Sequence, residues 1–97
     1  MNIELKKFGT ALISRQAGKE AFAAFQSSLK DIPEQEDIIA DFDGVITFSP
    51  SWGDEFLTPL IQRYGGRFKL MHTHNPSVKA TVEILEKSNN IKFNVVE

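Results

Sequence analysis

The chain has 97 residues, of which 41% are hydrophobic and 25% charged, and its formal net charge is −2 at pH 7. These are ordinary values for a globular protein, and this length leaves room for one hydrophobic core, so we expect one domain, residues 1–97. The balanced charge gives no basic stripe and argues against a nucleic-acid partner. The absence of cysteine excludes a disulfide scaffold and thiolate metal sites.

The segments that target a protein to a membrane or for export are also missing from the sequence. No apolar run approaches the roughly 18 residues that a membrane span needs. The first seven residues, MNIELKK, lack the apolar core of a signal peptide. We therefore expect a cytoplasmic protein.

The first third of the chain predicts a short strand followed by a helix. Alternating apolar residues indicate a strand over residues 2–7, which Gly9 ends. Ser14 is a favourable N-cap for a helix that runs to about residue 30. The apolar residues of that helix recur at spacings of three and four: Ala21, Phe22, Phe25 and Leu29.

The next strand is expected at residues 37–42. Its apolar run is too short for a typical helix and too uniformly apolar for a half-exposed strand, which is typical of a buried parallel strand. Asp41 and Asp43 stand at its carboxyl end, and Gly44 marks a turn. Because open α/β sheets bind ligands and partners at the carboxyl ends of their strands, we expect the functional site to begin here.

A second helix follows, with two alternative starting points. Ser49 can cap it with Pro50 at the first helical position, or Ser51 can be the cap. Asp54 and Glu55 then lie in the first turn, where the helix dipole favours negative charge.

The remaining chain repeats the alternation of strand and helix. Pro59 is expected to bend the second helix or to restart it at Thr58. A strand over residues 67–71, a helix starting at Asn75-Pro76 and a strand over residues 91–95 complete the order. The pattern predicts a small α/β fold with about four main strands, largely parallel, and three helices.

Three places in the sequence carry a resemblance to a known family: Phe8-Gly9 followed by Ser14-Arg15, the sequence DFDGV at 41–45 and the sequence SWGDEF at 51–56. On these motifs the whole chain, residues 1–97, resembles the STAS-like domain, a relative of the domain that sulphate transporters and anti-sigma factor antagonists share. The resemblance implies a regulatory protein-binding domain with no catalytic activity and no cofactor.

In anti-sigma factor antagonists, a serine at the start of the matching helix docks onto a partner kinase of the histidine-kinase-like ATPase type and is phosphorylated. The resemblance thus implies such a kinase or an anti-sigma-type regulator as the partner, with Ser51 as candidate phosphoacceptor. The alternative is that Ser51 is only a helix cap. The partner-binding residues that we expect for such a regulatory domain are Asp43, Gly44, Ser49, Ser51, Trp52, Asp54 and Glu55.

Two further residues near this segment each have two open interpretations. Trp52 is either an exposed anchor for a partner or a side chain that folds back over the sheet edge. Arg15 either reaches toward the carboxylate of Asp41 or Asp43 as a supporting residue, or remains in solvent.

A phosphatase is the enzymatic alternative. The sequence around Asp41 and Asp43 also resembles the first motif of haloacid-dehalogenase-type phosphatases, in which the first aspartate is the nucleophile, the second the general acid, and magnesium binds between them. Thr73 and Lys79 then imitate the second and third motifs. No acidic pair follows to complete the metal site, so a binding module remains the main interpretation.

The histidines offer a third alternative. His72 and His74 have the spacing that places two side chains on one face of an extended segment, where they can bind a transition metal together. The other interpretation is a polar loop that leads into the Asn75 cap. Since two ligands make a poor site, we predict no metal.

Overall fold

The computed structural model describes residues 1–97 and contains one main sheet of four parallel strands. The strands are β1 (Asn2–Glu4), β3 (Ile38–Asp41), β5 (Phe68–Met71) and β6 (Asn94–Val96), and they lie in the order β1-β3-β5-β6. The register aligns one residue of each strand in a row across the sheet: Ile3, Ala40, Leu70 and Val95. Because side chains alternate along a strand, this row belongs to one face of the sheet, the face that builds the core.

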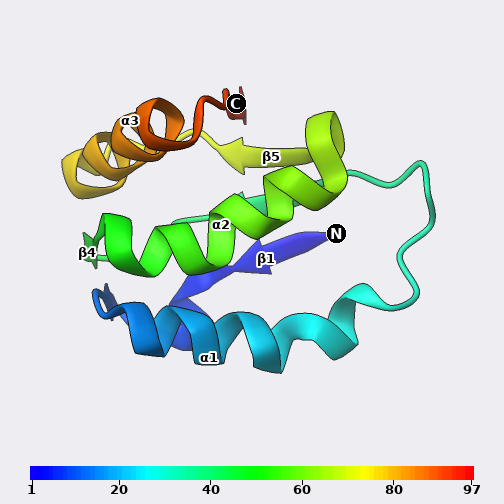
Figure 1. The fold of residues 1–97 in the computed structure, drawn as a ribbon, viewed down its shortest axis with the longest axis horizontal. Helices are drawn as coiled ribbons and strands as arrows, with labels where there is room; N and C mark the ends of the chain where they lie inside the picture. The colour runs from blue at the N-terminus through cyan, green and yellow to red at the C-terminus, as the bar shows by residue number, and fades with distance from the viewer.

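Three α-helices lie side by side against that face. They are α1 (Arg15–Phe25), α2 (Pro50–Tyr64) and α3 (Pro76–Asn89), with α2 between the other two (Figure 1). Short 3-10 turns extend three of the elements: η1 (Leu5–Phe8) follows β1, η2 (Gln26–Leu29) follows α1 and η3 (Gly65–Arg67) follows α2. None of the helices combines the length with the apolar composition that crossing a membrane requires.

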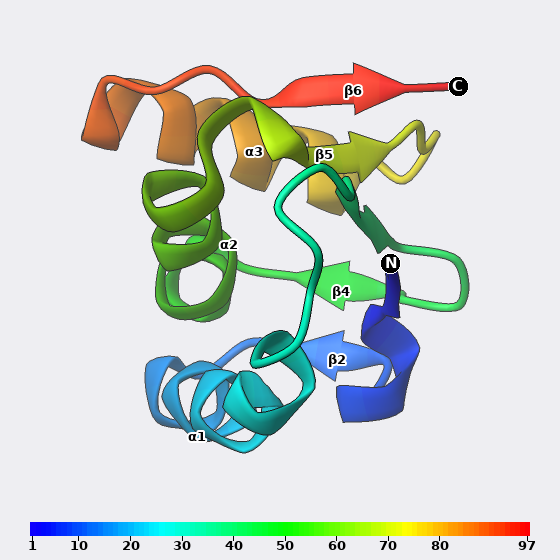
Figure 2. The same cartoon turned by 90° about the vertical axis from the view of Figure 1, so that its right-hand side faces the viewer.

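A second, two-stranded sheet consists of β2 (Ala11–Leu12) and β4 (Thr47–Phe48), which pair in parallel. Both strands run in the direction opposite to β5 and β6 (Figure 2). The chain therefore turns back after β3, and β4 carries it away from the carboxyl ends of the main strands before α2 begins.

An aromatic cluster fills the space between the helices and the two sheets. Trp52 stacks on Phe56 with 5.0 Å between the ring centroids and 23° between the planes, and both side chains are fully buried. The rings in contact with this pair are Phe8, Phe22, Phe25 and Phe48. Such large rings supply much of the apolar area that a short chain can bury.

The predicted α/β class, with its parallel sheet and three helices, is confirmed, but some element bounds were wrong. The first strand ends at Glu4 rather than at residue 7, because the chain turns into η1 to bury Leu5. Helix α2 does not restart at Thr58 but continues through Pro59 to Tyr64. Its buried face on both sides of the proline holds the helix together although one backbone hydrogen bond is lost.

Candidate functional site

Ser49 caps α2, and Pro50 occupies the first helical position, as the first of the two alternatives predicted. The Ser49 hydroxyl oxygen accepts a hydrogen bond from the Trp52 amide at 3.3 Å and donates one to the carbonyl oxygen of Ile13. Ser49 thereby ties the start of α2 to the segment before α1. Its hydroxyl is fully used by the fold.

Ser51 lies two residues further on and has a different environment. Its side chain is half-buried at the surface, and its hydroxyl makes no hydrogen bond to any other group of the chain. A serine in the first turn of a helix stands close to free backbone N–H groups, where negative charge is favoured. The Ser51 hydroxyl is therefore available for a partner or for modification without loss of the cap.

Arg15 pairs with the acidic residues of the first turns of α2. One guanidinium nitrogen donates to Asp54 Oδ2 at 3.1 Å and to Glu55 Oε2 at 2.6 Å. These two hydrogen bonds, with that to Glu55 the stronger influence, raise the pKa of the Arg15 guanidinium above its ordinary value. The prediction that Arg15 reaches Asp41 or Asp43 was wrong, because α1 begins beside α2 and not beside the end of β3.

Asp54 joins all three helices at this end of the molecule. Its Oδ2 accepts the hydrogen bond from Arg15 of α1. Its Oδ1 accepts hydrogen bonds from the Thr58 hydroxyl at 3.1 Å and from the Asn89 side-chain amide of α3 at 3.4 Å. A carboxylate that accepts several hydrogen bonds is held in one orientation. The charged surface beside Ser51 is thus an ordered one.

Trp52 is not an exposed anchor. Only 1% of its surface is accessible, because its ring packs among Phe8, Phe48 and Phe56. Of the two interpretations offered by the sequence, the structure shows the inward one, and Trp52 is removed from the predicted partner-binding residues. A residue in the first turn of a helix can face either way, so the sequence could not decide between them.

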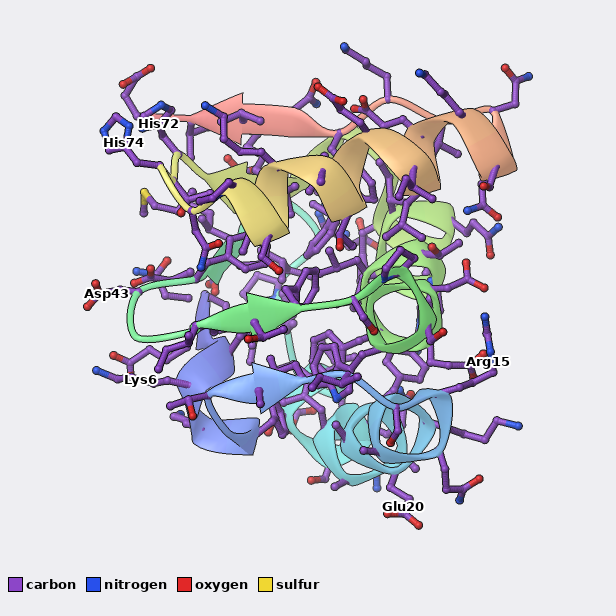
Figure 3. The ribbon with its side chains drawn as sticks, turned by 90° about the vertical axis from the view of Figure 1, so that its left-hand side faces the viewer. Lys6, Arg15, Glu20, Asp43, His72 and His74 are labelled. Atoms are coloured by element: carbon purple, nitrogen blue, oxygen red, sulfur yellow. The ribbon has the colours of Figure 1, made fainter.

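Asp43 and Gly44 do not join the other predicted site residues. Figure 3 shows Asp43 and Arg15 at opposite ends of the molecule, since β4 crosses between the turn and α2. Gly44 has φ of +88° and packs against the Lys6 side chain. The predicted site from Asp43 to Glu55 is therefore two separate surfaces, and only the one at the start of α2 brings several of its residues together.

The Asp41 side chain forms part of the turn after β3. Its Oδ1 accepts from the Asp43 amide at 3.0 Å, which is the Asx-turn geometry expected of a turn-forming aspartate. Asp41 lies on the sheet face opposite the buried Ala40 and Phe42, whereas Lys79 lines a cavity with Phe42 on the helix-covered face. By this alternation, Asp41 and Phe42 project from opposite faces of the sheet.

His72 and His74 lie close together at the end of β5. Their ring centroids are 4.7 Å apart, in an edge-to-face arrangement, and both residues are exposed. No third histidine, aspartate or glutamate joins them in a group that could hold a metal ion. The pair has the proximity that the spacing predicted, but not a third ligand.

The sequence reasoning missed a cavity between α3 and the strands β5 and β6. Its walls come from Leu70, Val82, Phe93 and ten other residues, and its volume is about 450 Å³. Val78 and Val82 are four residues apart in α3 and both line this cavity, on the face that the spacing of apolar residues marks as inward. Periodicity cannot show, however, whether the opposing strand fills the space in front of such residues.

Comparisons of the chain with family models, with curated proteins and with solved structures found no match.

Proposed function

We propose that this chain is a non-enzymatic regulatory domain of the cytoplasm that binds a protein partner at the start of α2. We call the region the α2-start surface, and it consists of Ile13, Arg15, Pro50, Ser51, Asp54 and Glu55. One observation carries the proposal: the Ser51 hydroxyl makes no hydrogen bond within the chain, whereas the hydroxyl of the capping residue Ser49 both donates and accepts one.

The composition of the α2-start surface suits a partner-binding patch. Ile13 is 51% exposed, an apolar side chain beside the ordered charges of Arg15, Asp54 and Glu55. Apolar contact supplies affinity, and a fixed charge pattern supplies orientation and selects against wrong partners. The α2-start surface has both features: the apolar side chain of Ile13, whose carbonyl oxygen is bonded to the cap residue Ser49, and the charges of the first turns of α2.

Phosphorylation of Ser51 is the switch that we propose for this surface. A phosphate brings about −1.5 to −2 charges to a position one turn before Asp54 and Glu55. Arg15 then faces three anionic groups rather than two, so the ion pairs on the surface must rearrange. Because the Ser49 cap and the buried Trp52 are untouched, folding survives while the surface seen by the partner changes.

The resemblance to anti-sigma factor antagonists suggests which class of protein the partner belongs to. In those proteins the serine at this helix start meets a histidine-kinase-like ATPase, and Ser51 stands at the matching position. We therefore propose a kinase of that type, or an anti-sigma-type regulator, as the partner. No nucleic acid or membrane takes part.

Site-specific photo-crosslinking tests this proposal directly, because the chain has no cysteine of its own. Ser51→Cys and Ile13→Cys each place a benzophenone probe on the α2-start surface. Ser27→Cys places the same probe on an exposed residue of η2 as the matched control. The proposal expects both surface probes, and not the control, to capture the same kinase or regulator from lysate of the source cell. Capture of the same proteins by all three probes would contradict it.

A further inference from the structure

We propose that the cavity between α3 and the strands β5 and β6 binds a small amphipathic carboxylate, with its apolar body inside and its carboxylate at the C-terminal end of β5. The volume of about 450 Å³ falls within the range of about 300–1,000 Å³ that is usual for small-molecule sites. The cavity lies outside the α2-start surface, so the inference does not depend on the proposed function.

The inner part of the cavity is apolar. Its hydrophobic residues come from both strands, from α3 and from the adjoining segments: Phe42, Leu70, Met71, Val78, Val82, Phe93 and Val95. Val95 is still 55% exposed although it belongs to the inner row of the sheet. An apolar wall that the fold leaves open is the feature that favours an apolar ligand body.

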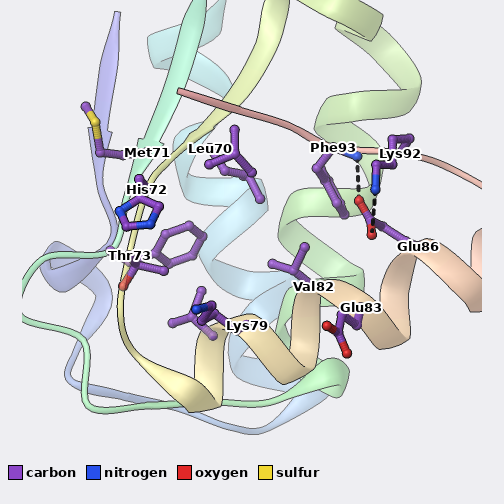
Figure 4. A pocket seen from close by; sticks show the side chains of 13 residues that line it. Leu70, Met71, His72, Thr73, Lys79, Val82, Glu83, Glu86, Lys92 and Phe93 are labelled. Atoms are coloured by element: carbon purple, nitrogen blue, oxygen red, sulfur yellow. Dashed lines mark hydrogen bonds and ion pairs between the residues drawn. The ribbon is translucent and has the colours of Figure 1, made fainter. Parts of the chain in front are cut away.

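Hydrogen-bond donors gather at one end of the cavity. Figure 4 shows His72, Thr73 and Lys79 near the end of β5, away from Phe93 and Glu86. The Lys79 ammonium forms none of the ion pairs of the chain. Thr73 accepts the Asn75 amide with its hydroxyl oxygen at 3.1 Å, which leaves the hydroxyl hydrogen free to donate.

Both acidic side chains that line the cavity, Glu83 and Glu86, lie away from His72 and Thr73 (Figure 4). Glu86 accepts the Phe93 amide at 2.9 Å and lies 3.9 Å from the Lys92 ammonium. A ligand carboxylate is therefore attracted to Lys79 and Thr73 and not to the Glu86 end. Because a hydrogen bond between charged groups is roughly twice as strong as a neutral one, Lys79 should dominate the orientation.

An NMR titration with two ligands of equal chain length and opposite charge tests the inference. Octanoate should perturb the amide signals of Leu70, Thr73 and Phe93 and saturate them, whereas octylamine should not. Lys79→Gln should lower the affinity for octanoate about tenfold, because a charge-assisted contact is lost. Lys87→Gln, on an exposed part of α3 outside the cavity, is the matched control and should change the affinity less than about twofold.

A second variant tests the apolar part of the site. Val82→Trp should fill the cavity and abolish the octanoate shifts while the unperturbed regions of the spectrum show an intact fold. Any of three results would overturn the inference. Octylamine could bind as well as octanoate, octanoate could still bind both Lys79→Gln and Val82→Trp, or the shifts could be confined to another surface.

Discussion

Gly18 of α1 lies directly against the backbone of Trp52 in α2. A β-carbon at residue 18 would stand 2.7 Å from the Trp52 carbonyl oxygen and 3.0 Å from its α-carbon. On the other side of α2, Gly53 faces α3, and a β-carbon there would meet Leu85 at 3.0 Å. These two glycines let both neighbouring helices approach the start of α2, and so determine the shape of the α2-start surface.

Gly18→Ala should therefore destabilise the protein. Alanine favours a helix by about 1 kcal/mol over glycine, but overpacking against a backbone that cannot move aside costs about 1–3 kcal/mol. Because a 2.7 Å approach to a backbone oxygen belongs at the upper end of that range, we expect a net loss of about 2 kcal/mol in the free energy of unfolding, measured by urea denaturation. Gly66→Ala is the control, since its β-carbon would meet only Asn94, at 3.9 Å, and should leave stability unchanged. A neutral Gly18→Ala would contradict the close approach of α1 and α2.

The two serines at the start of α2 should respond differently to alanine. Ser49→Ala removes the N-cap and the bond to Ile13, and should lower the free energy of unfolding by about 1–2 kcal/mol. Ser51→Ala removes no hydrogen bond within the chain and should stay within about 0.5 kcal/mol of wild type. Urea denaturation of both variants measures the difference. A larger loss for Ser51→Ala than for Ser49→Ala would reverse the assignment of the cap.

Trp52 should behave as a core residue in solution. Its fluorescence should resist quenching by acrylamide in the folded protein and become fully accessible in urea, because 1% of its surface is exposed. Trp52→Phe should lower the free energy of unfolding by about 1–3 kcal/mol but leave the affinity of the folded protein for its partner unchanged. Ready quenching in the native state would show that the ring is at the surface.

The turn at Asp41 gives a test of the enzymatic alternative. Wild-type protein should not hydrolyse p-nitrophenyl phosphate with magnesium above the rate of a mock purification. Asp41→Ala should lower stability by about 1 kcal/mol through loss of the bond from the Asp43 amide, whereas Asp41→Asn, which can still accept it, should be nearly neutral. Magnesium-dependent hydrolysis that Asp41→Asn abolishes would instead support a phosphatase.

Local signals in the sequence predicted most of the fold. Ser14 accepts the Ala17 amide, and Asn75 accepts from Ser77 and Val78, so both caps formed where the residue type and the following pattern placed them. Such caps depend on contacts within three residues, which a sequence displays directly. The order of strands and helices followed from the same short-range patterns.

The site depended on contacts that no short-range pattern contains. Arg15 meets Asp54 across 39 residues of sequence, and the reversal of direction at β4 separates Asp43 from the helix that it precedes. Neither the packing partner of a helix nor the direction of a two-residue strand follows from periodicity. For the same reason the sequence could not decide whether Trp52 faced inward, nor show the cavity beneath α3.

The most direct test of the α2-start surface is the affinity of the captured partner for the unlabelled domain, measured by isothermal titration calorimetry. Ser51→Asp adds a negative charge on the surface, and Ser27→Asp adds the same charge on η2 as the control. The account predicts that Ser51→Asp weakens binding by at least about tenfold, since a like charge or an unpaired group at an interface costs more than 1.4 kcal/mol. Ser27→Asp should stay within about twofold of wild type. Equal affinity of the wild type and Ser51→Asp would contradict the account, and Ser51 would then be no more than a surface residue of α2.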